Sequence, residues 1–110
     1  MEFLEAKGIQ GGTIIFDGKK ITIKRRGFMA FATHGIKGDK IIPIKFITAI
    51  QFKSAGRFSN GYIQFSIMGG REAKGGLLQA VHDENTVLFK KKQQPEFEKI
   101  KEEIEKIIYS

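Results

Sequence analysis

The sequence of 110 residues contains no cysteine and no tryptophan. Without cysteine the chain can form no disulfide, no thiolate metal site and no cysteine nucleophile. It also lacks an apolar run of about 18 residues, which a membrane-spanning helix would require. The first ten residues carry Glu2 and Glu5 and have no apolar core, so they are not typical of a signal peptide. We therefore expect a cytoplasmic protein.

What the chain does contain is typical of a globular protein. Hydrophobic residues make up 41% and charged residues 28% of the sequence, a balance that allows a packed core. A chain of this length supports one core and not two. We expect a single domain over residues 1–110.

The charge is basic and unevenly distributed. The formal net charge is +7, with a net +6 in residues 1–53, +3 in residues 54–94 and −2 in residues 95–110. A basic body attracts nucleic acid, anionic lipid or an acidic protein through long-range electrostatics, and it also keeps a small protein soluble.

The clearest local motif is a β-hairpin. Two runs with strand character, Thr13–Phe16 and Lys19–Arg25, flank Asp17-Gly18, and Asp-Gly favours a two-residue type I′ turn. This turn predicts that Phe16 lies opposite Lys19. The core face of the hairpin then carries Ile14, Phe16, Ile21 and Ile23, and the outer face carries Thr13, Ile15, Lys20, Thr22 and Lys24.

Further short strands follow, so that strands extend over about residues 9–90. They are predicted at Phe28–Thr33, Lys40–Ile44, Ile47–Lys53, Tyr62–Met68 and Thr86–Lys90. Between the second and third of these runs, Lys45 and Phe46 are predicted to form a jog. Between the third and fourth, Ser54–Asn60 is predicted to form a loop.

The C-terminal segment is predicted to be a helix over about residues 95–109. Apolar residues recur there at steps of three and four, which gives one apolar stripe made by Phe97, Ile100, Ile104, Ile107 and Ile108. Pro95 suits the first helical turn, and Glu102 and Lys106 have the spacing of an ion pair. Because the helix is amphipathic, we expect it to cover the open side of the sheet.

These elements together predict a mainly β (α+β) fold. About seven antiparallel strands followed by one amphipathic helix are the layout of a pleckstrin-homology-like (PH-like) barrel. In that arrangement two roughly orthogonal sheets leave an open corner, and the C-terminal helix fills it.

The sequence also resembles a bacterial PH-like domain family of unknown function, which is often found next to short C-terminal helical (SHOCT) modules. The resemblance extends from about Gly8 to Ile108 and implies the PH-like fold but no reaction. It rests on residues 9–18, 21–23, 38–44, 47–53, 60–66 and 83–89. Lys24-Arg25-Arg26 resembles half of the basic pattern of phosphoinositide-binding PH domains. The other half is missing, because the first strand of the hairpin has no basic residue.

The sequence motivates no catalytic or metal site. His82-Asp83-Glu84 are consecutive and would point in different directions, and His34 lies in a glycine-rich turn. No serine–histidine–aspartate arrangement can be assembled. We therefore expect a protein that is not an enzyme and that needs no metal or cofactor.

The hypothesis is a binding or scaffold module that acts through protein–protein contacts, with homo-oligomerisation as one form of them. Ile15, Phe31 and Phe46 fall on outer faces and could form an interface if they cluster. The alternative is a basic surface that binds anionic lipid or nucleic acid. The candidate residues for binding an anion or a partner are Lys20, Lys24, Arg25, Arg26, Lys90, Lys91 and Lys92.

Overall fold

The computed structural model describes residues 3–25, 39–68 and 85–110. In the described part the chain is mainly β, with two antiparallel sheets and one C-terminal helix, as predicted. The predicted strand at Phe28–Thr33 lies outside the described residues.

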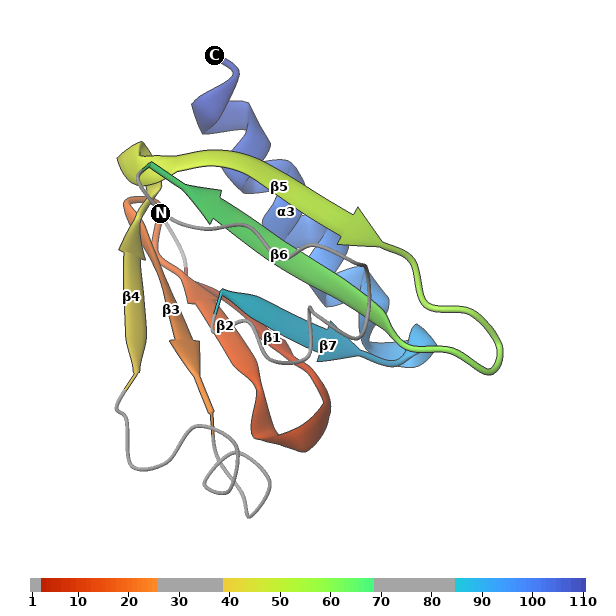
Figure 1. Cartoon of the computed structure of the whole chain (residues 1–110). Helices are drawn as coiled ribbons and strands as arrows, with labels where there is room; N and C mark the ends of the chain where they lie inside the picture. Colours follow the sequence, from red (N-terminus) through yellow and green to blue (C-terminus); the bar gives the residue numbers. More distant parts are fainter. Residues whose placement is uncertain (1–2, 26–38, 69–84) are drawn as a thin grey trace.

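The first sheet has four strands in the order β1-β2-β3-β4 (Figure 1). They are β1 (Leu4–Lys7), β2 (Thr13–Phe16), β3 (Lys20–Lys24) and β4 (Lys40–Pro43). The second sheet has three strands in the order β5-β6-β7. They are β5 (Ile47–Lys53), β6 (Gly61–Ile67) and β7 (Thr86–Phe89). The two sheets are not closed into a barrel, so this part of the prediction is wrong for the described strands.

Strand β1 was not expected from the sequence, which predicted strands only from about residue 9. It pairs with β2, and Leu4 lies opposite Phe16. Its pattern is weak because Leu4 and Ala6 are its only apolar residues. Ala6 is nevertheless fully buried, since the C-terminal helix packs on β1.

The β2–β3 hairpin has the predicted faces but a different register. Phe16 pairs with Ile21 and not with Lys19, so the central residues of the turn are Gly18 and Lys19. Gly18 has a φ of 96°, a conformation that glycine adopts without steric cost. The register differs from the expected one by two residues. Because side chains alternate with a period of two, the same residues still face the core.

A short 3-10 helix, η2 (Ile44–Phe46), carries the chain from the first sheet to the second. It occupies the position of the jog predicted at Lys45 and Phe46. Two other 3-10 turns, η1 (Ile9–Gly11) and η3 (Lys91–Gln93), precede β2 and the C-terminal helix. η2 therefore connects the end of β4 directly to the start of β5.

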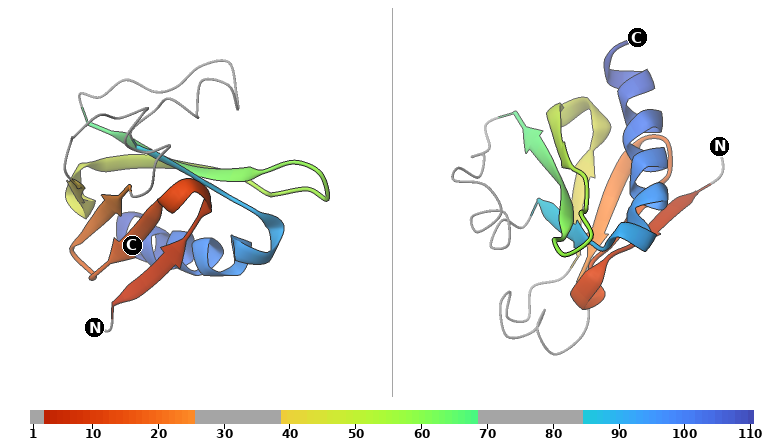
Figure 2. Two further views of the ribbon diagram at one scale, coloured as in Figure 1. Left: turned by 90° about the horizontal axis from the view of Figure 1, so that it is seen from below. Right: turned by 90° about the vertical axis from the view of Figure 1, so that its right-hand side faces the viewer.

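The helix α3 (Gln94–Ile108) packs against β1 of the first sheet and β5 of the second (Figure 2). It buries Phe97, Ile100 and Ile104 completely or almost completely. The Phe97 ring stacks on that of Phe89, with 4.7 Å between ring centroids. The core therefore joins both sheets and the helix.

Two details of the helix differ from the prediction. Ile107 is 42% exposed, and the apolar stripe continues instead through Ile108, which is partly buried against the core. Lys106 forms its ion pair with Glu103, at 2.9 Å, and not with Glu102. The hydrogen bond from Lys106 to Glu103 raises the pKa of Lys106 above its ordinary value.

Candidate functional site

The cations predicted on the hairpin lie on β3 or just after it. Lys20 and Lys24 are on one face of the strand, since they alternate with the buried Ile21 and Ile23. They stand at opposite ends of this five-residue strand. Arg26 lies outside the described residues.

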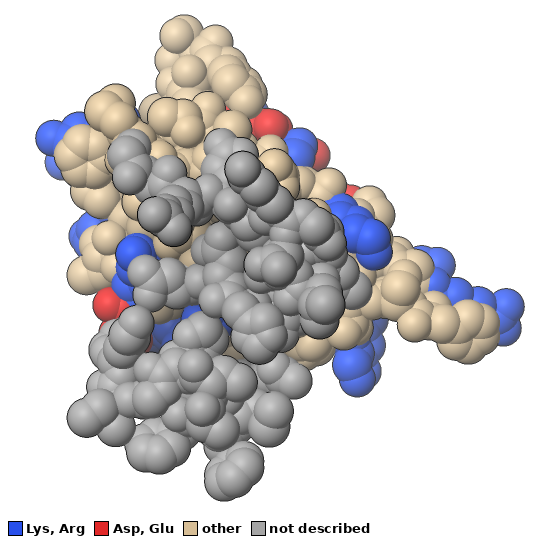
Figure 3. Space-filling view, in the orientation of Figure 1, with Lys and Arg blue, Asp and Glu red and all other residues tan. Residues whose placement is uncertain are grey.

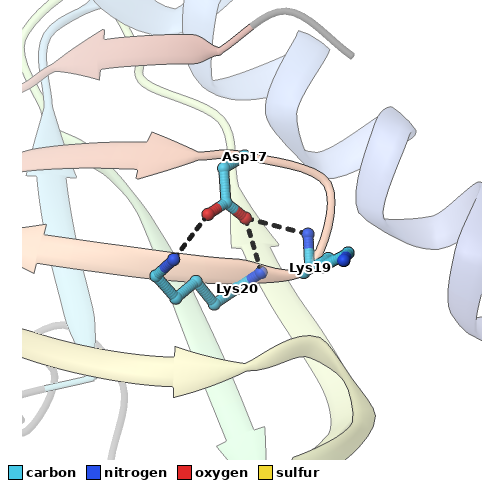
Figure 4. Close-up of polar contacts among 3 residues, drawn as sticks. All are labelled: Asp17, Lys19 and Lys20. Atoms are coloured by element: carbon cyan, nitrogen blue, oxygen red, sulfur yellow. Dashed lines mark hydrogen bonds and ion pairs between the residues drawn. The ribbon is translucent and has the colours of Figure 1, made fainter.

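Lys20 is held by the turn that precedes it (Figure 4). The Asp17 carboxylate accepts hydrogen bonds from the backbone nitrogens of Lys19 and Lys20, each at 2.9 Å, and from Lys20 Nζ at 2.7 Å. The Lys20 ammonium contributes most to lowering the pKa of Asp17 well below its ordinary range, and the backbone donors add to this effect. Asp17 therefore stabilises the turn, and its carboxylate forms an ion pair with Lys20, one of the predicted binding cations.

Arg25 points toward the second sheet. One of its guanidinium nitrogens, Nη2, donates a hydrogen bond to the backbone oxygen of Thr86 in β7. This contact ties the end of β3 to β7. Arg25 therefore joins the two sheets, whereas Lys20 and Lys24 lie on the outer face of β3.

The second predicted group, Lys90–Lys92, lines a hollow at the other end of the molecule. This basic hollow has a volume of about 460 Å³ and lies between η3 and the β5–β6 connection. Figure 3 shows Lys and Arg gathered at that projecting end. Its lining residues are Gly56, Arg57, Phe58, Ser59, Asn60, Lys90, Lys91 and Lys92.

The basic hollow carries four cationic side chains, namely those of Arg57 and Lys90–Lys92. None of the eight lining residues that belong to the described part of the chain is acidic. Within the described residues, none of these cations forms an ion pair with an acidic side chain. Their charges therefore add to one another at this end of the molecule.

Hydrogen bonds from the start of α3 hold the two walls of the basic hollow together. Gln94 Oε1 accepts a hydrogen bond from the backbone nitrogen of Ala55, and Gln94 Nε2 donates to Ser54 Oγ. The η3 wall is closed by Gln93, whose Oε1 accepts from the backbone nitrogen of Lys90. The hollow is thus built by the fold and does not arise from surface side chains alone.

The sequence predicted Ser54–Asn60 only as a loop, so Arg57 and Phe58 were missed as candidate functional residues. Phe58 is 94% exposed, and the Arg57 guanidinium lies over its ring at 5.5 Å from the centroid. An aromatic residue placed inside a predicted loop, outside any alternating strand pattern, was the available signal. Its proximity to Lys90–Lys92 follows from strand pairing that local patterns do not specify.

Two further hollows lie around η2 and are mainly apolar. The edge hollow, of about 380 Å³, is lined by Lys40–Pro43, Phe46, Ile67 and Met68. The helix-end hollow, of about 760 Å³, is lined by Lys19, Lys20, Pro43, Ile44, Lys45, Ile47, Ile107 and Ile108. Pro43 belongs to both, so the two hollows adjoin.

Exposed apolar side chains gather in the edge hollow. Ile41 is 55%, Phe46 is 43% and Met68 is 67% exposed. Of the three outer apolar residues predicted from the sequence, Phe46 belongs to this group, Ile15 is half-buried in β2, and Phe31 lies outside the described residues. Ile41 and Met68 were not predicted as exposed, because each belongs to an otherwise ordinary strand pattern.

The described residues contain no group of three or more histidine, aspartate or glutamate side chains that could hold a metal ion. His34 and His82 lie outside this part of the chain. No helix among the described residues is both long and apolar enough to cross a bilayer.

Comparison with known proteins identifies a family but no annotated relative. No curated protein and no solved structure shows significant similarity to the chain. A family described as "Domain of unknown function (DUF4429)" matches residues 14–105, which include most of β2, all of β3 to β7 and most of α3. The chain therefore belongs to this domain family of unknown function.

Proposed function

We propose that this chain is a non-catalytic PH-like module that binds a partner protein through the edge hollow and the adjoining helix-end hollow. The element order supports the PH-like assignment. A four-stranded antiparallel sheet is followed by a three-stranded one, and a C-terminal helix then packs against both. This order of elements is consistent with the PH-like layout, except that the strands are not closed into one barrel.

The observation that carries the proposal is the grouping of Ile41, Phe46 and Met68 in one hollow. Scattered exposed apolar residues are normal on a protein surface, whereas contiguous ones mark interaction sites. These three come from β4, from η2 and from the residue after β6. The fold therefore brings together apolar groups that are separated in the sequence.

The surroundings of the hollows indicate the chemistry of the partner. None of the described residues that line either hollow is acidic, and Lys19 and Lys45 are exposed beside the apolar surface. A protein segment with apolar side chains flanked by aspartate or glutamate would complement this surface. Burial of apolar side chains would provide the affinity. Charge complementarity would orient the bound segment and increase the rate of association.

β4 adds a second mode of contact, because it lies at one edge of the first sheet among the described strands. An extended segment can pair with such an edge and place alternate side chains into neighbouring pockets. Pro43 cannot donate to a ladder, so pairing would be confined to the part of β4 that precedes it. A second copy of the chain is one partner that could bind in this way.

The proposal is tested by selecting peptides from a displayed random library on the purified full-length chain. We expect enrichment of apolar residues flanked by acidic ones. The double variant Ile41→Ser/Met68→Ser should lose at least tenfold in affinity for the selected peptides. The variant Lys91→Glu/Lys92→Glu, which alters the basic hollow, should bind them as the unaltered chain does.

Light scattering over a wide concentration range provides the self-association measurement. A dimer that Ile41→Ser/Met68→Ser dissociates would identify a second copy as the partner. Selected peptides that bind this variant as tightly as the unaltered chain would refute the proposed surface, provided that circular dichroism shows both proteins to be folded.

A further inference from the structure

The basic hollow and the exposed ring beside it are not used by the proposed protein-binding surface. They lie on the β5–β6 connection and on η3, whereas the apolar hollows surround η2. We infer that this end of the molecule docks on an anionic membrane surface, with Phe58 inserted among the lipid headgroups and Arg57 and Lys90–Lys92 bound to acidic headgroups. This inference is independent of the protein-binding proposal.

Charge is the first argument. Each lysine or arginine held near an anionic leaflet strengthens binding to it. Arg57 and Lys90–Lys92 line a single hollow whose described lining residues include no acidic one, so a planar anionic surface can reach their charges together. The acidic residues of α3 begin at Glu96, beyond the residues that line the hollow.

The second argument is the position of Phe58. Its side chain is 94% exposed, and its loop projects from the body of the molecule in Figures 1 and 3. An apolar ring in water at a projecting end does not contribute to the core. Transfer of such a ring into the membrane interface, with cations beside it, combines apolar burial with electrostatic attraction.

The loop is also constructed to hold this position. The backbone nitrogen of Gly56 donates to the oxygen of Ser59 at 2.9 Å, which closes a turn around Arg57 and Phe58. Lys53 Nζ donates to the oxygen of Asn60 at the base of the loop. Together with the contact between Ala55 and Gln94, these bonds present the ring and the cations on one supported element.

Nucleic acid is the competing ligand, and the geometry favours the membrane. Binding of single strands uses aromatic rings on which successive bases stack. Among the described residues that line the basic hollow, Phe58 is the only one with an aromatic ring, and the Arg57 guanidinium lies over that ring. Insertion at a membrane interface needs one exposed ring and no stacking platform.

The test is co-sedimentation of the full chain with two kinds of vesicle, phosphatidylcholine alone and phosphatidylcholine with phosphatidylserine. We expect binding to the anionic vesicles that weakens strongly when salt is raised. Lys91→Glu/Lys92→Glu should lower the partition coefficient at least about tenfold. Phe58→Ser should lower it about fivefold, since the ring no longer inserts.

Matched control variants distinguish the effect of where a residue lies from the effect of its charge or apolar surface alone. Lys19→Glu/Lys45→Glu changes the net charge by the same amount beside the helix-end hollow, and Phe3→Ser removes another exposed ring, one that is 73% exposed. Both controls should bind anionic vesicles within about twofold of the unaltered chain, because general charge falls off over a Debye length.

Three results would overturn the inference. The first is equal binding to neutral and anionic vesicles, or to neither. The second is an equal loss of binding in Lys19→Glu/Lys45→Glu and in Lys91→Glu/Lys92→Glu. The third is filter binding of a single-stranded oligonucleotide that depends on Phe58 and Lys91 while vesicle binding does not. None of these results bears on the apolar hollows, so the two proposals fail separately.

Discussion

The side chain of Gln94 is joined to the backbone of Ala55, with 2.7 Å between Gln94 Oε1 and the Ala55 nitrogen. Ala55 belongs to the β5–β6 connection, and Gln94 is the first residue of α3. The same amide donates to Glu98 through Nε2, at 2.7 Å. One side chain therefore fixes the loop that carries Arg57 and Phe58 to the start of the helix.

We predict that Gln94→Ala destabilises the protein by about 1 kcal/mol, because a partly buried backbone donor loses its acceptor. Urea denaturation measures this change. Hydrogen exchange at the Ala55 amide should accelerate more than exchange at core amides, since the opening is local. Lys99→Ala, at an exposed position of the same helix, should change stability by less than about 0.5 kcal/mol. Unchanged protection at Ala55 would contradict the prediction.

Gly61 and Gly56 offer a matched pair of glycine substitutions. A Cβ at Gly61 would meet the backbone oxygen of Lys53, would lie 2.5 Å from Phe89 Cε1 and 2.6 Å from the Ala55 nitrogen. Two of these neighbours are backbone atoms and the third belongs to a buried ring. Gly61→Ala should therefore cost about 1–3 kcal/mol through overpacking.

At Gly56 the corresponding Cβ comes within 3.0 Å of only one atom, Ser59 Oγ at 2.7 Å. A serine side chain can rotate away, so Gly56→Ala should be tolerated to within about 1 kcal/mol. Thermal or urea unfolding of both variants checks the difference. Equal destabilisation by the two substitutions would show that β6 does not approach β5 and β7 as closely as described.

The hairpin illustrates what the sequence can specify. Alternation of apolar residues correctly predicted that Ile14, Phe16, Ile21 and Ile23 face the core, and all four are buried. The turn was assigned wrongly, because Asp17 was assigned to a central position of the turn. The Asp17 carboxylate instead accepts hydrogen bonds from the backbone nitrogens of Lys19 and Lys20. The central residues of the turn therefore lie one residue later than predicted. Which face of the sheet a side chain occupies depends only on the alternation along the strand. The register of the pairing depends on single contacts such as those of Asp17.

The basic hollow shows why the candidate site was only half predicted. Lys90–Lys92 form an obvious basic run, but Arg57 is far from them in the sequence. The two segments meet because Gly61 pairs with Phe89 in the β6–β7 ladder, which sets the residues before β6 beside those after β7. This pairing is a long-range property, and local alternation cannot predict it.

Asp17 should make stability depend on pH in the acid range. Its pKa is lowered in the folded protein, mainly by the hydrogen bond from Lys20. The folded state therefore favours the carboxylate, and the stabilisation is complete above the ordinary pKa of aspartate, about 3.9. It is lost as the pH falls below this value through the lower pKa of the folded state.

We predict that Asp17→Asn lowers stability at neutral pH and flattens the decline of stability below about pH 4. Asparagine retains an acceptor oxygen for the backbone nitrogens but loses the ion pair with Lys20. Urea unfolding as a function of pH measures the effect. A difference between the variant and the unaltered chain that stays constant down to the lowest pH would be inconsistent with titration of Asp17.

The last prediction concerns the stack of Phe97 on Phe89, which joins α3 to the second sheet. Both rings are fully buried. The Phe52 ring also contacts that of Phe89, with 5.3 Å between the ring centroids. Phe97→Leu keeps most of the apolar volume but removes the ring contact, so it should cost about 0.5–1.5 kcal/mol beyond the loss of buried area.

Phe97→Ala removes the volume as well and should cost about 3–5 kcal/mol, a large part of the stability of a small domain. Urea unfolding of both variants, with Tyr109→Leu as a control at a position that is 67% exposed, orders the three effects. If α3 seals the core as described, the helix and the sheets unfold together. Helix signals should then be lost at the same urea concentration as signals from β6 and β7. If the helix and the sheets of Phe97→Leu unfold at different urea concentrations, the helix is not part of the cooperative core and the two sheets form a core without it.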